Sequence, residues 1–230
     1  QVQVRRIGMS DLEASVIDWS QFSWSSPETL QTVGRKVARP HQREAIDAVR
    51  AGLAEQDRGK LIMACGTGKT FTSLRLAEQI VGEGGQVLFL VPSISLLSQT
   101  VREWASEAEL PLRMLAVCSD AKATKRSAAV NEDISAVDIA LPATTNLAVL
   151  QERWSAAAED TSAMTVVFST YQSLDVVSKA QAAGGFEPFD LIVCDEAHRT
   201  TGATLAGEDE SNFVKVHSGA TIRGKKRLYM

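Results

Sequence analysis

The sequence predicts an α/β domain in which helices flank a mainly parallel central sheet. Short apolar runs of strand length alternate with longer segments whose apolar residues recur at helical spacing, and this βαβα order is typical of a parallel sheet with right-handed crossovers. Residues 87–91 are almost continuously apolar, as expected for a strand buried on both faces. Two polar motifs each follow such a run, at the position where parallel sheets bind their ligands.

The first predicted elements are delimited by proline and glycine. Pro40 is a favourable first helical residue, and apolar residues at helical spacing carry a helix over 40–55. Gly59 separates this helix from a strand over 60–65. A second helix over 69–81 is followed by three glycines, which stop it.

The later elements follow from the same criteria, apolar runs for strands and helical spacing for helices. In chain order they are a strand over 87–91, a helix marked by 96–104, a strand over 113–118, helix candidates near 121–130 and 144–157, a strand over 165–169, a short helix over 171–182, a strand over 191–194, a loop over 219–226 and a strand beginning at 227.

The segment Met63-Ala-Cys-Gly-Thr-Gly-Lys-Thr70 has the composition of a phosphate-binding loop between a strand and a helix. Its glycines allow a tight curl, so successive N–H groups can point at phosphate oxygens, and the following helix N-terminus favours anions. We expect Lys69 to reach the β- and γ-phosphates and the Thr70 hydroxyl to ligate Mg²⁺. The strict pattern has Gly where this chain has Met63. The predicted nucleotide-binding residues of the loop are Cys65, Gly66, Thr67, Gly68, Lys69 and Thr70.

The second motif places two carboxylates after the apolar run 191–194. We expect Asp195 to hold the same Mg²⁺, through water, and Glu196 to orient or deprotonate the attacking water. The two motifs together predict an ATP-hydrolysing core with Lys69, Asp195 and Glu196 as its catalytic residues and with Thr70 and Asp195 at the metal.

The tetrad Asp195-Glu-Ala-His198 resembles the signature of the DEAH group of superfamily 2 helicases and translocases. Residues 39–42 resemble the adenine-reading Q motif, although that family often has Tyr in place of His41. Residues 90–100 resemble motif Ia, and 168–173 resemble the later turn that touches the nucleic-acid backbone. The resemblance spans residues 38–230 and implies a RecA-like P-loop NTPase domain that uses ATP and Mg²⁺.

Within this superfamily the chain is most similar to the motor subunits of restriction enzymes, of types I and III and of the single-polypeptide class. The similarity lies in Gly-Thr-Gly-Lys-Thr preceded by Ala-Cys, and in the run Asp-Glu-Ala-His-Arg-Thr-Thr-Gly that ends at Gly202. RNA helicases of the DEAD group carry Pro-Thr-Arg-Glu-Leu-Ala at motif Ia, and this chain does not.

The resemblance also implies further binding residues. Arg39 and Gln42 are expected at the nucleotide, with Gln42 on the adenine edge, and His198 couples the nucleotide site to motif III or bonds only locally. The candidates for contact with the DNA backbone are Ser93, Thr100, Arg102, Thr170 and Gln172, whose alternative roles are helix capping or a solvated face.

Two domains are expected. Residues 1–37 form an N-terminal arm or linker that docks through the aromatic residues Trp19, Phe22 and Trp24, and 38–230 form the first RecA-like domain. The chain stops before motif III, so we expect a fragment whose partners are a second RecA-like domain and, in the same protein, possible nuclease or methyltransferase modules.

Composition sets further bounds. A hydrophobic share of 44% can build a sizeable core, and no apolar run reaches the length of a membrane span. The net charge of −4 argues against a large basic footprint, but such motors also hold nucleic acid with hydroxyls and N–H groups. Cys65, Cys118 and Cys194 have neither disulfide nor zinc spacing, which favours buried free thiols in a reducing cytoplasm, with Cys65 as the exception to watch because it lies inside the phosphate loop.

The sequence therefore predicts the first motor domain of a DNA helicase or translocase, acting on double-stranded DNA in a restriction-modification or phage-defence protein. One alternative is an RNA helicase of the DEAH group. The other is a non-hydrolysing, ATP-dependent clamp or scaffold, and the presence of Lys69, Asp195 and Glu196 argues against it.

Overall fold

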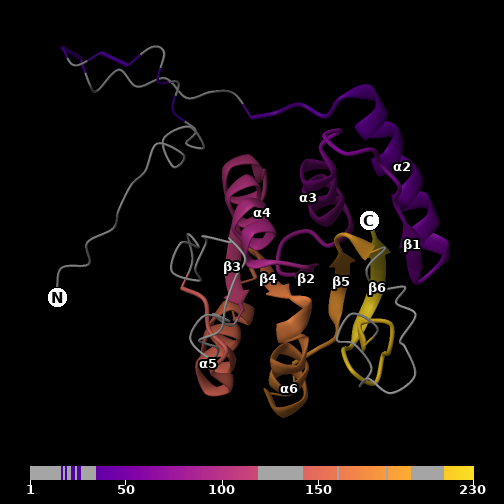
Figure 1. Ribbon diagram of the computed structural model, residues 1–230, viewed down its shortest axis with the longest axis vertical. Helices are drawn as coiled ribbons and strands as arrows, with labels where there is room; N and C mark the ends of the chain where they lie inside the picture. The colour runs from indigo at the N-terminus through magenta and orange to yellow at the C-terminus, as the bar shows by residue number, and fades with distance from the viewer. Residues whose placement is uncertain are drawn as a thin grey trace, which may run out of the picture.

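Six parallel strands form a central sheet in the order β1-β6-β5-β2-β4-β3 (Figure 1). The computed structural model describes residues 35–118, 142–159, 161–184, 186–197 and 215–230, and residues 17, 19, 22, 23, 25 and 26 of the N-terminal part. The strands are β1 (Arg58–Lys60), β2 (Gln86–Val91), β3 (Leu112–Val117), β4 (Met164–Thr170), β5 (Phe189–Cys194) and β6 (Gly224–Tyr229). Each neighbouring pair in this order is parallel, which confirms the predicted fold class.

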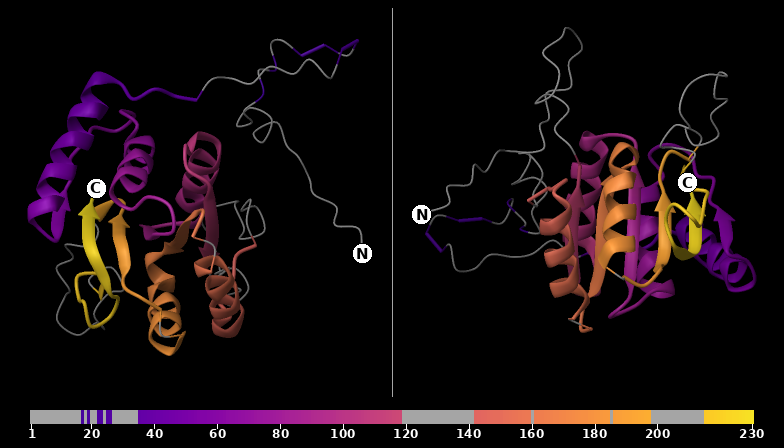
Figure 2. Two further views of the ribbon diagram at one scale, coloured as in Figure 1. Left: turned by 180° about the vertical axis from the view of Figure 1, so that it is seen from behind. Right: turned by 90° about the horizontal axis from the view of Figure 1, so that it is seen from below.

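Helices cover both faces of the sheet (Figure 2). They are α2 (Pro40–Glu55), α3 (Lys69–Ile80), α4 (Ile94–Glu107), α5 (Leu147–Ala158) and α6 (Leu174–Gly184), with a short 3-10 turn at Tyr171–Ser173. The first three pack on one face and the last two on the other. Because side chains alternate along a strand, Phe89 of β2 packs edge-on to Trp104 of α4, while Leu88 and Leu90 join the cluster of Trp154.

A buried ion pair ties α3 to the segment after α4. Arg75 contacts Glu78 at 2.5 Å and donates to the Glu107 carbonyl at 2.9 Å. The Glu78 carboxylate accepts the backbone N–H of Glu109 and, at 3.0 Å, that of Leu110. Each charge of the buried pair is thus hydrogen-bonded as well as paired, which is the condition under which such pairs are tolerated in a core.

Two element boundaries were wrong. The predicted strand over 60–65 is β1, which ends at Lys60; after the bond from Leu61 N–H to the Tyr229 carbonyl, the chain leaves the sheet for the glycine loop. The predicted loop over 219–226 ends earlier, because β6 begins at Gly224. Its two lysines suggested a loop, but Lys225 pairs with Asp190 at 2.7 Å and Lys226 donates to the Leu53 carbonyl.

The remaining predicted helices and strands occur within a few residues of their expected bounds. The helix candidate near 121–130 lies outside the described residues. No helix in the described ranges has the length and apolarity needed to span a membrane.

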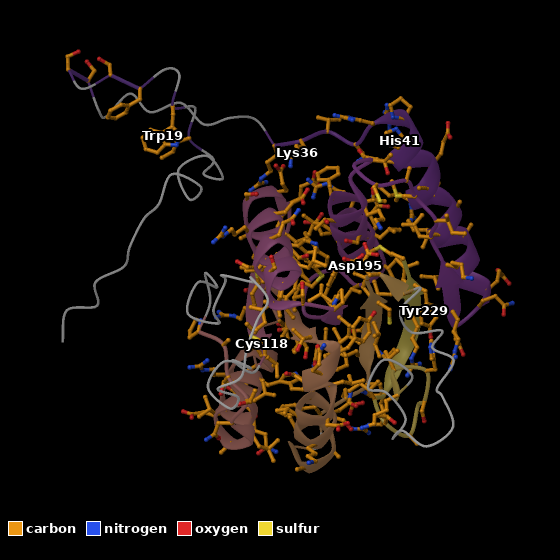
Figure 3. All side chains as sticks on the ribbon, viewed as in Figure 1. Trp19, Lys36, His41, Cys118, Asp195 and Tyr229 are labelled. Atoms are coloured by element: carbon orange, nitrogen blue, oxygen red, sulfur yellow. The ribbon has the colours of Figure 1, made fainter. Side chains whose placement is uncertain are left out.

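The proposed boundary between an arm and the domain at residue 38 stays a prediction. Trp19 and Phe22 pack on each other with centroids 5.6 Å apart. Lys36 lies close to α4 (Figure 3), since its backbone N–H donates to the Glu107 carboxylate at 2.8 Å and its ammonium group lies 3.5 Å from Glu103.

Candidate nucleotide-binding site

The phosphate-binding loop connects β1 to α3 through two glycines in the left-handed region. Gly66 has φ 75° and Gly68 has φ 86°, conformations that side chains other than glycine rarely adopt. Between them, the Thr67 hydroxyl donates to the Ala64 carbonyl at 2.7 Å and closes the curl. The first helical residue is Lys69, so the N-terminal N–H groups of α3 face the loop. This is the geometry that the sequence predicted.

Gln42 of α2 supports the loop through a hydrogen bond to its backbone. Its buried side-chain amide donates to the Thr67 carbonyl at 3.0 Å and accepts the Arg39 N–H at 2.9 Å. A Cβ on Gly68 would lie 2.4 Å from the same amide nitrogen, so any other residue there would displace the Gln42 side chain as well as strain φ. The contact of Gln42 with adenine remains a prediction, as does that of Arg39, whose side chain is exposed.

The acidic motif lies directly after β5, at the same edge of the sheet (Figure 3). Asp195 N–H donates to the Leu90 carbonyl at 2.9 Å, and Ala197 N–H donates to the Met230 carbonyl at 2.7 Å. Between these anchors Glu196 has φ 53°, a left-handed conformation that is costly for a side chain of this size. Its own N–H donates to the Asp195 carboxylate at 3.0 Å.

The two motifs meet at one ion pair. Lys69 Nζ lies 3.4 Å from Glu196 Oε1, and both side chains are partly buried. The loop cation and the carboxylate expected to activate water are therefore neighbours, as the catalytic prediction requires. Because Lys69 already has this partner, a triphosphate in the loop would have to compete with Glu196 for the ammonium group.

Burial raises the pKa of Asp195 above its usual value, although the Glu196 N–H and Lys69 act against that shift. A raised pKa means that the ionised carboxylate lowers stability: the loss is absent below about pH 4, grows as pH rises through the raised pKa and is complete above it. A cation beside Asp195 relieves this cost, since it favours the ionised form.

The donor set fits Mg²⁺. That ion is typically held by one or two protein oxygen ligands together with phosphate oxygens and water. Asp195 supplies a buried carboxylate, and Thr70 supplies a hydroxyl from the first turn of α3. Among the described residues no group of three or more His, Cys, Asp or Glu side chains could hold a metal ion, so a structural metal centre finds no support in the described part of the chain.

The candidate DNA contacts divide by exposure. Ser93 and Gln172 follow β2 and β4, neighbouring strands whose ends pair Val91 with Thr170. Gln172 is exposed and lies 3.4 Å from the Pro92 carbonyl, whereas Ser93 also caps α4 by accepting the Leu96 N–H at 3.3 Å.

Two of the other three candidates lie deeper. Thr100 and Thr170 are buried, and the Thr170 hydroxyl donates to Ser173 at 3.2 Å. Arg102 is partly buried on α4. All five candidates stay predictions, and His198, the predicted coupling residue, lies outside the described residues.

Sequence reasoning missed Tyr171 and overstated the burial of the cysteines. The Tyr171 hydroxyl donates to the Asp195 carbonyl at 2.9 Å, and the only sequence signal was an aromatic residue directly after a strand. Cys118 and Cys194 are buried free thiols, as expected, but Cys65 is exposed because the loop carries it out of the sheet.

A cavity of about 580 Å³ opens beside Lys69, between β1 and the end of β6. His217 contributes to its wall: its Nδ1 lies 3.0 Å from the Tyr229 hydroxyl, and its carbonyl accepts from Arg58 at 2.8 Å. Its lining includes Lys60, Met63, Ala197 and Met230.

Comparison with known proteins places the chain among restriction and helicase proteins. Residues 35–222 match the family described as "Type III restriction enzyme, res subunit". The chain is similar to the solved structure of the "ATP-dependent Type ISP restriction-modification enzyme LlaBIII bound to DNA", with 45% identity, a TM-score of 0.82 and coverage of 97% of this chain and 14% of that one.

Two further relatives agree. A nuclease-deletion mutant of the Type ISP restriction-modification enzyme LlaGI, solved with a DNA substrate mimic, is 42% identical, with a TM-score of 0.68 and coverage of 84% of this chain and 17% of that one. The "Probable helicase A859L" of African swine fever virus (isolate Pig/Kenya/KEN-50/1950) is 29% identical over 179 residues, which are 78% of this chain and 18% of that protein. The chain thus spans less than a fifth of the length of each of these relatives.

Proposed function

This chain belongs to the family of the type III restriction enzyme res subunit, and on that premise we propose that it is the ATP-hydrolysing motor domain of a longer protein that moves along double-stranded DNA. The observation that carries the proposal is the 3.4 Å contact between Lys69 of the phosphate loop and Glu196 of the acidic motif. It brings a phosphate-binding cation and a candidate base to one point at the carboxyl edge of a parallel sheet, where such folds bind nucleotides.

In the proposed mechanism each residue has one task. The loop N–H groups and Lys69 hold the β- and γ-phosphates. Thr70 and Asp195 would hold Mg²⁺, which would neutralise the negative charge that develops on the phosphates. Glu196, released from Lys69 when the phosphates bind, orients the attacking water and accepts its proton. Gln42 keeps the loop in shape and reads the adenine edge.

We favour DNA over RNA as the nucleic acid along which the domain moves. Two restriction-modification enzymes that are 45% and 42% identical to this chain were solved with DNA or a DNA mimic. Ser93 and Gln172, beyond neighbouring strands, are the proposed first contacts with the sugar-phosphate backbone. A second RecA-like domain and, in the same protein, nuclease or methyltransferase modules are the proposed partners, and the free thiols suit a cytoplasmic protein.

The test uses the full-length protein and the Glu196→Gln variant, which keeps the shape of the side chain and removes the base. ATP should still bind, while DNA-stimulated hydrolysis should fall by about 10²-fold or more. DNA that stimulates hydrolysis when RNA of the same length does not would separate this function from an RNA helicase. Turnover near wild type in Glu196→Gln would mean that Glu196 is not the water-activating group, and no turnover in the wild type would instead favour a non-hydrolysing clamp.

The isolated chain should hydrolyse ATP slowly even with DNA present. An arginine finger from a second domain contributes on the order of 10³ to 10⁵ in rate in related phosphoryl transfers. Phosphate release faster than about one per second from the purified chain would mean that its catalytic set is already complete.

A further inference from the structure

Tyr171 physically links two parts of the domain that the proposed function must coordinate. It is the first residue after β4, fully buried, between Thr170 and Gln172 of the turn proposed to face nucleic acid. Its hydroxyl donates to the Asp195 carbonyl at 2.9 Å, although 24 residues separate the two in sequence. The same hydroxyl lies beside the buried thiol of Cys194.

The accepting carbonyl belongs to the peptide that sets the position of Glu196. Glu196 is strained at φ 53°, and its carboxylate lies 3.4 Å from Lys69. The Asp195 N–H is already fixed to the Leu90 carbonyl, so the hydroxyl of Tyr171 fixes the other side of this residue. Rotation of the peptide between residues 195 and 196 would move the Glu196 carboxylate relative to the phosphate loop, and it would break the bond to Tyr171.

The opposite end of the link is exposed. Gln172, the next residue, has an exposed side chain whose amide lies 3.4 Å from the Pro92 carbonyl, beside Ser93. A strand of nucleic acid that contacts this turn therefore acts one peptide away from Tyr171. Burial raises the pKa of the Tyr171 phenol, so the hydroxyl stays protonated and remains a donor at every physiological pH.

We propose that Tyr171 is a positioning residue that couples the turn over 170–173 to Glu196, so that nucleic acid on the turn adjusts the water-activating carboxylate. This inference rests on the proposed function. It assigns Tyr171 no contact with the nucleotide; the residue acts through the Asp195–Glu196 peptide alone.

Tyr171→Phe isolates the hydroxyl, because the ring and its packing remain. Ser178→Ala, on α6, is the matched control, because it also removes one hydroxyl that donates to a backbone carbonyl, in this case the carbonyl of Thr221. Both variants should lose stability of the same order, since each loses a hydroxyl that donates to a backbone carbonyl. Only Tyr171→Phe should change how hydrolysis responds to DNA.

The experiment compares full-length wild type and both variants, with kcat and KM for ATP measured with and without double-stranded DNA. For Tyr171→Phe we expect DNA stimulation of kcat to fall about fivefold, the effect of one lost hydrogen bond, with KM for ATP within about twofold of wild type. Ser178→Ala should keep the wild-type stimulation. In amide hydrogen exchange, the N–H of Glu196 should also exchange faster in Tyr171→Phe alone.

Two outcomes would overturn the inference, and they differ from failure of the proposed function. If DNA stimulation of kcat is unchanged in Tyr171→Phe, Tyr171 contributes only to core packing. An equal loss in Ser178→Ala would make the effect one of general stability. If the wild type itself hydrolyses ATP without any response to DNA, the proposed function fails, and the coupling fails with it.

Discussion

Three glycine-to-alanine substitutions test the loop geometry in a graded series. Gly52 lies within α2, with no positive φ and nothing within 4 Å of an added Cβ. Gly66 has a positive φ but open space around it, and Gly68 has both a positive φ and the Gln42 amide at 2.4 Å. The series therefore separates helix propensity, backbone strain and steric conflict.

The expected changes in the free energy of unfolding follow from these three environments. Gly52→Ala should stabilise the chain by about 0.5–1 kcal/mol, because alanine loses less entropy in a helix. Gly66→Ala should cost about 1–2 kcal/mol for the left-handed backbone. Gly68→Ala should cost about 2–4 kcal/mol, because displacing Gln42 also breaks its bonds to Thr67 and Arg39.

Urea unfolding of the nucleotide-free chain measures the three changes. Adding Gln42→Ala provides the control: in that background the steric conflict is gone, so Gly68→Ala should cost no more than Gly66→Ala does. Equal losses for the two loop variants in the presence of Gln42 would refute the reasoning, since it would show that the amide does not brace the loop.

Two further substitutions test the buried charges, and a third, in an exposed ion pair, provides a control. Asp195→Asn should raise the thermal midpoint at pH 7, because it removes a buried carboxylate whose raised pKa lowers stability. This gain should vanish below about pH 4, where the carboxyl group is protonated in both the folded and the unfolded state. Calorimetric scans at both pH values test this, and a lower midpoint at pH 7 would contradict it. Glu78→Ala should cost about 3 kcal/mol, because it removes the buried carboxylate that pairs with Arg75 and leaves Arg75 with the exposed carboxylate of Glu109, at 3.1 Å. Asp47→Ala breaks the exposed pair with Arg50, which has the same i,i+3 spacing, and should cost under about 1 kcal/mol; similar losses would mean that burial does not set the strength of these pairs.

The fold and the nucleotide motifs were predictable because each depends on local patterns. Apolar runs and glycines identify strands, the loop and the helix after it, and parallel strands bring both motifs to one edge. The boundary errors arose where tertiary contacts override local composition. Lys225 and Lys226 suggest a loop in sequence, yet in the sheet they reach Asp190 and the end of α2.

The site details that sequence could not supply depend on distant backbone atoms. Tyr171 donates to a carbonyl, and any residue can present a carbonyl, so no side-chain pattern records the pairing. The resemblance placed Gln42 at adenine but did not predict its bond to the Thr67 carbonyl, because the acceptor is again a backbone carbonyl. The positive φ of Glu196 could not be predicted either, because glutamate normally avoids that backbone conformation.

The central claim is that the loop closed by Gly68 binds Mg·ATP through Lys69. Calorimetric titration of the wild type, Lys69→Ala and the exposed-surface control Lys179→Ala with Mg·ATP tests it most directly. Binding should be measurable for the wild type and the control and absent for Lys69→Ala, which lacks the side-chain cation that faces Glu196. Equal affinity in all three proteins would contradict the account.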